Sequence, residues 1–213
     1  MVSVMVRAYH RMQNGQIVQV SEYQQNREGK KFEGNAIPKE FREKIAEKES
    51  STHGLKEIHS ESGALGRYQF KPDTLFEMGM IDKNSKNANW TKKAESVGVR
   101  TNEDFLNSES AQEFTFSEMM EYIHGKFAKN GSFRHLGQII KGIKENIEID
   151  VPGLMAAGHR AGAGAVKKYL SYMEQHKWES NSYNNDKTLP LRQRKKFLAI
   201  ETRLREFKGE KIQ

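Results

Sequence analysis

Two kinds of hydrophobic pattern divide the chain. Residues 2–23 alternate between apolar and polar positions and are rich in valine, and Asn14-Gly15 lies between the two alternating runs. Alternation with a period of two is typical of β-strands, and Asn-Gly is a strong signal for a hairpin turn. From Pro38 onward the apolar residues recur every three or four positions, which is the period of amphipathic helices. The pattern predicts an α+β protein, mainly α, with an N-terminal β-hairpin.

Five segments carry the helical pattern and share an apolar stripe with a polar opposite face. The stripes are Phe41 and Ile45; Phe116, Met120, Ile123 and Phe127 in a helix that starts near Ser108; Leu136, Ile139, Ile140 and Ile143; Val166, Tyr169, Leu170 and Met173; and Phe197, Ile200, Leu204 and Phe207 in a basic helix from Pro190 to about Lys208. Residues 24–36 read as a linker and residues 178–187 as a polar loop. We therefore expect a hairpin and linker in residues 1–36, a helical domain in residues 37–176, and a polar loop with a C-terminal basic amphipathic helix in residues 177–213.

Composition narrows the chemistry. The 213 residues include no cysteine, which excludes disulfides and a thiolate nucleophile. The seven histidines show no ligand spacing, so we expect no catalytic metal and no cofactor. A formal net charge of +7 and a pI near 9.4 favour polyanionic partners, among which are cell-wall polymers and nucleic acids.

Three short motifs follow one another in the expected helical domain. A Glu49-Ser50 pair closes the helix that begins at Pro38, residues 63–69 read GALGRYQ, and residues 157–166 read AGHRAGAGAV. In this order they resemble the lysozyme-like superfamily of muramidases and soluble lytic transglycosylases, most closely a branch of phage and type VI secretion proteins. The resemblance covers roughly residues 38–176. It implies a lysozyme-like helical domain that cleaves the β-1,4 bond between N-acetylmuramic acid and N-acetylglucosamine in peptidoglycan.

Glu49 is the predicted general acid. It continues the apolar stripe of Phe41 and Ile45 at intervals of four residues, so one helix face ends in a carboxylate. Burial and the negative end of the helix dipole both favour the neutral acid, and from these two effects we expect a raised pKa. A group that stays protonated near neutral pH can protonate a glycosidic oxygen. The competing interpretation, a surface glutamate in a lysine-rich helix, is weakened by the two motifs downstream.

The glycine-rich turn supplies the predicted glycan contacts. Gly63 and Gly66 allow positive φ and a close backbone approach. Tyr68 offers an aromatic platform and Gln69 an amide for a sugar, although a packed tyrosine in a tight turn explains Tyr68 nearly as well. The resemblance adds Ser50 to this group of substrate-binding residues.

A second carboxylate is less clearly marked. Glu61, in the loop before the turn, is the first choice for activating water in a hydrolase. Glu113 lies near the start of a helix and is a candidate substrate contact, but it also suits a capping box with Ser110. Asp73, directly after Pro72, is most simply a helix cap.

His159 marks a departure from the transglycosylase pattern. It stands where those enzymes have a tyrosine, and Arg160 stands where they have an asparagine. We expect His159 to support the site by hydrogen bonding. The change leaves open whether the product is that of hydrolysis or of transglycosylation. Gly162 and Gly164 are expected to let this helix pack close to the helix of Glu49.

The first residues do not read as a signal peptide, and no run is long enough for a membrane span. We therefore expect synthesis in the cytoplasm and action in the periplasm or cell wall, after delivery as a type VI secretion effector. The expected partners are peptidoglycan, a cognate immunity protein and a secretion-system component. The alternatives are a lytic transglycosylase, a phage endolysin released at lysis, and a non-catalytic protein that binds wall glycan or nucleic acid. The basic run RQRKK at 192–196 is compatible with binding to nucleic acid or to an anionic membrane, but no aromatic residues are interleaved with it. Because Glu201, Glu206 and Glu210 interrupt the positive charge, a docked helix with a solvated basic face is the preferred interpretation.

Overall fold

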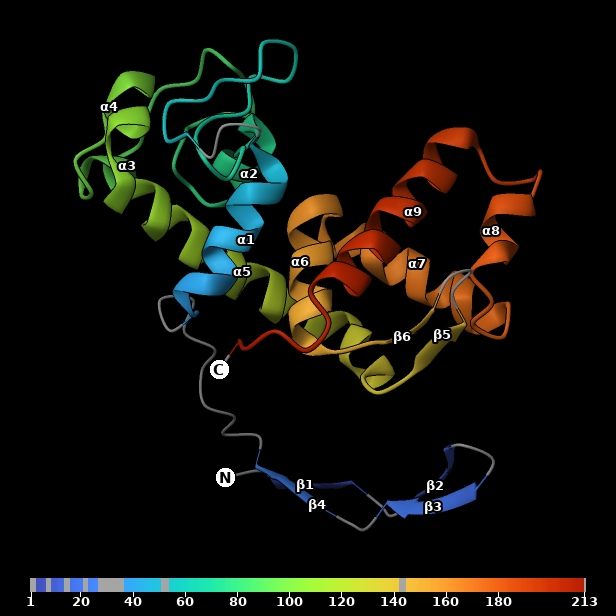
Figure 1. Cartoon of the computed structure of the whole chain (residues 1–213). Coiled ribbons are helices and arrows are strands. Elements are labelled where there is room, and N and C mark those ends of the chain that lie inside the picture. Colours follow the sequence, from blue (N-terminus) through green and yellow to red (C-terminus); the bar gives the residue numbers. More distant parts are fainter. Residues whose placement is uncertain are drawn as a thin grey trace. The chain divides into compact units, whose positions relative to one another are not determined.

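The computed structural model describes residues 3–6, 9–13, 16–20, 23–26, 37–50, 54–141 and 145–212 (Figure 1). The chain divides into two compact units, Met1–Phe32 and Glu33–Gln213. No helix within the described ranges is long and apolar enough to cross a bilayer.

The first unit consists of four short strands. They are β1 (Ser3–Val6), β2 (Tyr9–Gln13), β3 (Gln16–Val20) and β4 (Tyr23–Asn26). β2 pairs antiparallel with β3, and β1 pairs antiparallel with β4. Gln13 lies opposite Gln16, so the chain reverses between these two positions. The predicted hairpin is confirmed, while Asn14-Gly15 itself lies outside the described residues.

The second unit is mainly helical, which confirms the predicted fold class. Its helices are α1 (Lys39–Glu49), α2 (Pro72–Glu77), α3 (Lys92–Glu95), α4 (Asn102–Asn107), α5 (Glu109–Asn130), the 3-10 helix η2 (Ser132–His135), α6 (Val151–Ala161), α7 (Ala163–Gln175), α8 (Asn181–Asn185) and α9 (Leu191–Glu206). The strands β5 (Ile139–Lys141) and β6 (Asn146–Glu148) form one antiparallel pair.

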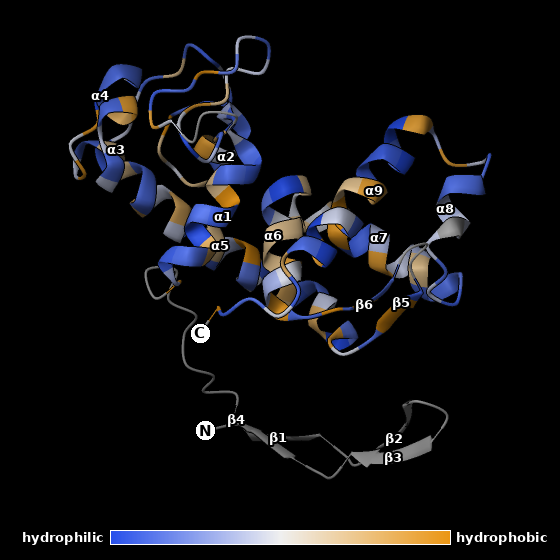
Figure 2. Ribbon diagram, in the orientation of Figure 1, coloured by the Kyte–Doolittle hydropathy of each residue, from blue (hydrophilic) through white to orange (hydrophobic). Residues whose placement is uncertain are grey.

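Helix α6 is the centre of this unit and packs against α5, α7 and α9. It shows the pale and orange colours of apolar residues along most of its length (Figure 2), and every residue from Pro152 to Gly158 is buried. Gly158 allows the approach of α5, because a Cβ there would lie 2.6 Å from Ile123 Cγ2. The glycines expected to serve close packing, Gly162 and Gly164, have open space around them, and this prediction is wrong. Gly162 instead ends α6 with a φ of 82°.

The stripes predicted for the first and last helices are confirmed. Phe41 and Ile45 of α1 are fully buried, as are Ile200 and Leu204 of α9. The ring of Phe41 meets that of Phe207 edge-on at a centroid distance of 5.3 Å. α9 is therefore docked in the same unit as α1, although the sequence set residues 177–213 apart.

Two segments differ from the sequence-based expectation. Residues 136–143 were expected to be helical, but they contain Gly137 at a φ of 77° and strand β5, whose β-branched isoleucines suit a strand. Ile140 faces inward opposite the buried Ile147 of β6. Ile143 lies outside the described residues. The expected polar loop after Trp178 contains α8, because Tyr183 is buried and anchors it.

Candidate functional site

A groove of about 610 Å³ crosses the second unit and brings parts of the three motifs together. Its lining includes Glu49 at the end of α1, Tyr68 and Gln69 from the glycine-rich turn, and His159 and Arg160 from α6. Side chains of α2, α5, α7 and α9 complete the lining. Residues from all three motifs, which are far apart in the sequence, therefore lie around one groove.

Two arginines hold the carboxylate of Glu49. Arg203 of α9 donates from Nη2 to Oε1 at 2.8 Å, and Arg160 donates from Nη1 to Oε2 at 2.9 Å. The same Nη2 of Arg203 donates to the backbone oxygen of Lys48, so it also satisfies a carbonyl at the end of α1. The side chains of Glu49 and Arg203 are 6% and 9% exposed, whereas that of Arg160 is 49% exposed. One partner is therefore buried and the other is open to water.

These partners reverse the expected charge state of Glu49. Burial raises the pKa of its carboxyl, but His159, Arg160 and Arg203 lower it by more, so the pKa lies below its usual range. His159 is itself neutral above about pH 4, so at neutral pH the two guanidinium groups supply the positive charge. The prediction of a raised pKa is wrong for the free protein. It rested on the end of a single helix, and it omitted cations that arrive from α6 and α9.

His159 lies beside Glu49 without a hydrogen bond of its own. Its Nδ1 is 3.8 Å from Oε1 of Glu49, and its side chain is 5% exposed. Burial is the main reason that the pKa of His159 falls to about 4. Among the described residues neither ring nitrogen has a hydrogen-bond partner. Leaving both nitrogens of a buried imidazole without hydrogen bonds costs free energy, and a polar group that reached them would lower that cost.

The glycine-rich turn is fixed to α5 by a buried amide. Gln112 accepts a bond from the backbone nitrogen of Arg67 at 2.9 Å and donates to the backbone oxygens of Leu55 and Phe105. Gly66 has a φ of 74°, and a Cβ there would lie 2.3 Å from Gln112 Oε1. The prediction that glycine is needed here for positive φ and a close approach is confirmed.

Within the turn, Gln69 remains available to a ligand while Tyr68 does not. Tyr68 is fully buried and stacks on Phe116 at a centroid distance of 4.3 Å, so it is not a platform for a sugar ring. The alternative interpretation of Tyr68, a packed residue of a tight turn, is the correct one. Gln69 is half-buried in the groove wall, and its amide donates to the backbone oxygen of Gly66 at 2.9 Å.

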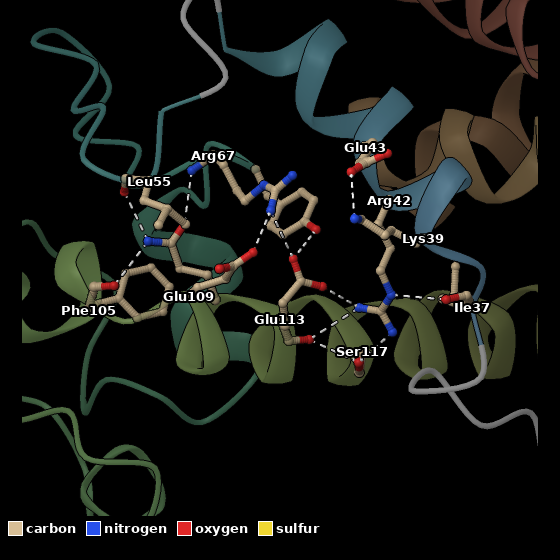
Figure 3. A network of polar contacts seen from close by, with 12 residues as sticks. Ile37, Lys39, Arg42, Glu43, Leu55, Arg67, Phe105, Glu109, Glu113 and Ser117 are labelled. Atoms are coloured by element: carbon tan, nitrogen blue, oxygen red, sulfur yellow. Dashed lines mark hydrogen bonds and ion pairs between the residues drawn. The ribbon is translucent and has the colours of Figure 1, made fainter.

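Glu113 belongs to a separate network shown in Figure 3. Its Oε2 accepts from Arg42 at 2.8 Å, and its Oε1 accepts from the hydroxyl of Tyr68 and from Arg67 at 3.4 Å. Glu113 is not part of the groove lining. The predicted capping role is also wrong, because Ser108 caps α5 by accepting from the backbone nitrogen of Ala111. Glu113 instead joins α1, α5 and the turn.

Two further predicted residues lie outside the groove lining. The side chain of Glu61 is exposed, and its backbone oxygen accepts a hydrogen bond from Lys86 at 2.5 Å. Ser50 is buried, and its hydroxyl donates to the backbone oxygen of Ala46. The structure does not bring either residue into the groove.

The groove contains functional groups that were not predicted to belong to the site. Asp73 and Glu77 of α2 are exposed carboxylates in its lining. Asp73 is not the cap of α2, because that position is taken by Lys71. Arg203 was part of a helix whose basic face was expected to be solvated. A signal for Arg203 existed, because it lies three residues after Ile200 and four before Phe207, and this spacing places it beside the apolar stripe.

No group of three or more histidine and acidic side chains in the described ranges could hold a metal ion. Comparisons of the chain with protein-family models, with curated proteins and with solved structures found no match.

Proposed function

We propose that the second unit cleaves the glycan strands of peptidoglycan, with Glu49 as the general acid of a muramidase. The observation that carries this proposal is the position of Glu49, a mostly buried carboxylate that lines an open groove together with Gln69 and His159. General-acid catalysis requires a carboxyl within hydrogen-bond reach of the leaving oxygen and shielded from bulk water. The groove wall supplies the shielding.

The charge partners of Glu49 set the condition for this chemistry. An ionised carboxylate cannot donate a proton, so the acid must gain one before the bond breaks. Arg160 is half-exposed, and a glycan that displaces its guanidinium removes one of the charges that lower the pKa of Glu49. A bound sugar also removes water from the carboxyl, which favours the neutral form. Substrate binding and protonation of Glu49 are therefore coupled in this proposal.

His159 has a supporting role beside the acid. The residue lines the groove, but both of its unpartnered nitrogens are buried, so in this proposal a small movement of the groove wall exposes them, after which one can donate to a sugar hydroxyl or acetamido oxygen and the other can accept. Since His159 remains neutral above about pH 4, it adds no positive charge that would oppose protonation of Glu49.

Glu49→Gln is the direct test. The amide has nearly the same shape and still accepts a hydrogen bond, but it has no proton to give. We expect the release of soluble fragments from isolated peptidoglycan to fall by roughly 10²- to 10⁴-fold. Glu113→Gln is the matched control, since it removes an arginine-bound carboxylate outside the groove. Activity of Glu49→Gln within a few-fold of the wild type would overturn the assignment.

Mass spectrometry of the fragments then identifies the reaction, because a hydrolysed end and a 1,6-anhydro end differ by one water. If water is the attacking group, a second carboxylate is expected to assist it. Asp73 lines the groove and Glu61 does not, so Asp73→Asn should slow hydrolysis more than Glu61→Gln. The opposite order would return the role to Glu61.

A further inference from the structure

The groove contains a row of cations that the cleavage chemistry does not use. Lys167 of α7 and Arg192 and Lys196 of α9 are exposed and belong to its lining. Arg192, Lys196 and Arg203 are separated by four and seven residues, so they share one face of α9. At 1.5 Å per residue, Lys196 lies about 10 Å and Arg192 about 16 Å along the helix axis from Arg203. The row therefore leads away from Glu49 and its neighbours His159, Arg160 and Arg203, here called the Glu49 cluster.

These three cations have no acidic partner in the part of the chain that the structure describes. No ion pair with another described side chain forms at Lys167, Arg192 or Lys196. By contrast, Arg203 and Arg205 of the same helix pair with Glu206 and Glu201.

The acids of the groove outside the Glu49 cluster are on another element. Asp73 and Glu77 belong to α2, and neither pairs with a described cation. The exposed acids of the groove are thus confined to α2, whereas exposed cations without an ion pair to a described side chain lie at Lys71 just before α2, at Lys126 of α5, and at the three positions on α7 and α9. The three cations of α7 and α9 have no acid of the lining on their own helices, so an anionic group is attracted to that side of the groove.

We propose that Lys167, Arg192 and Lys196 bind the carboxylates of the peptide stems on the glycan, so that the protein prefers peptide-bearing strands to bare glycan. This inference rests on the proposed function. A neutral sugar chain gives no reason for three unpaired cations beside the cleavage site, whereas a stem attached to a sugar near Glu49 extends sideways and carries carboxylates. Lysine and arginine at the surface bind such groups as point charges and as planar donors, respectively.

The chain offers a closely matched control. Lys168 and Lys195 are also exposed, adjoin Lys167 and Lys196 in sequence, and do not line the groove. Lys167→Ala/Lys196→Ala and Lys168→Ala/Lys195→Ala therefore remove the same charge from the same two helices on different faces.

The binding experiment uses the full chain with Glu49→Gln, which prevents cleavage, and compares insoluble peptidoglycan with the same material after an amidase has removed its peptides. We expect the preference for peptide-bearing strands to fall roughly tenfold in the Lys167/Lys196 variant and to stay unchanged in the Lys168/Lys195 variant. Equal losses in the two variants would show attraction by net charge alone and would overturn the proposal. Loss that disappears when wall phosphate polymers are stripped beforehand would assign the row to phosphates, which also overturns it.

This test and the test of the proposed function fail separately. Binding is measured without cleavage, so a stem preference that depends on Lys167 and Lys196 supports the inference even if wild-type protein releases no fragments. Conversely, cleavage that depends on Glu49 but is equally fast on bare glycan would leave the proposed function intact and reject the stem site.

Discussion

Glu49 and Glu113 are each held by two arginines, but the two clusters differ in what remains unsatisfied. Arg42 and Arg67, the partners of Glu113, have side chains only 12% and 16% exposed, and the hydroxyl of Tyr68 completes the carboxylate's bonds. At Glu49 one arginine is half-exposed, and the neighbouring His159 has no hydrogen-bond partner among the described residues. The first cluster joins structural elements, whereas the second has capacity for a ligand.

The comparison shows why an arginine-bound glutamate is not by itself a sign of function. Both carboxylates satisfy the requirement that a buried charge be paired. The two differ in that only Glu49 lines the groove, and in that only Glu49 lies beside a buried side chain, His159, whose ring nitrogens have no hydrogen-bond partner among the described residues. Mutations can therefore separate a cluster that stabilises the fold from one that, in the proposed function, receives a substrate.

The largest expected effect on stability comes from His159. The unfolded chain binds a proton near the ordinary histidine pKa of 6.5, whereas folded His159 stays neutral to about pH 4. Stability is therefore lost as the pH falls from 6.5 to 4, by about 3 kcal/mol in total, and no further below that. Glu49 adds to the loss only below its unfolded pKa near 4.5, because its folded pKa is lowered.

Denaturant unfolding between pH 7 and pH 4 measures this effect. In His159→Gln the fall in the free energy of unfolding over that range should be smaller than in the wild type by about 3 kcal/mol. The same slope in both proteins would mean that burial does not hold His159 neutral, and the contrast between the two clusters would lose its main support.

The next effect tests the Glu113 cluster. Glu113→Gln leaves two mostly buried guanidinium groups with one carboxylate fewer, and we expect a loss of about 2 kcal/mol in the free energy of unfolding at pH 7. Cleavage activity at a temperature where the variant remains folded should stay within a few-fold of the wild type. A large loss of activity in the folded variant would place Glu113 in the reaction after all.

The smallest effect concerns Arg160. Arg160→Gln removes a positive charge beside Glu49 and should raise the pKa of Glu49. In the pH profile of kcat/KM, the alkaline limb, where activity falls with rising pH, should therefore move to higher pH. Because Arg160 is half-exposed, we expect a change of less than about tenfold at neutral pH. Arg160→Lys keeps the charge and serves as the control. An identical limb in both variants would show that Arg160 does not control protonation of Glu49.

Sequence patterns predicted the features that depend on a single helix or turn. The stripe of Phe41 and Ile45, the reversal between Gln13 and Gln16, and the stripe of α9 are all confirmed, because periodicity records which face is buried. The position of Glu49 at the end of such a stripe was visible for the same reason.

Properties that depend on contacts between distant elements could not be read from the sequence. The charge state of Glu49 is set by Arg160 and Arg203, which are 111 and 154 residues away. The roles of Tyr68 and Glu113 follow from a bond between a turn and a helix 45 residues apart. Isoleucines at 139 and 140 fit a short strand as well as a helix, and only pairing with β6 decides between them.

The pairing of Glu49 with Arg203 has a consequence for synthesis. Translation proceeds from the N-terminus, so α1 leaves the ribosome long before α9 exists, and until then the buried carboxylate lacks its buried counter-charge. We expect the end of α1 to stay unpacked and accessible in the nascent chain, and to pack only after α9 has left the ribosome. A chain that stops before Leu191 should accordingly be cut near Glu49 by a glutamate-directed protease, while the complete chain resists.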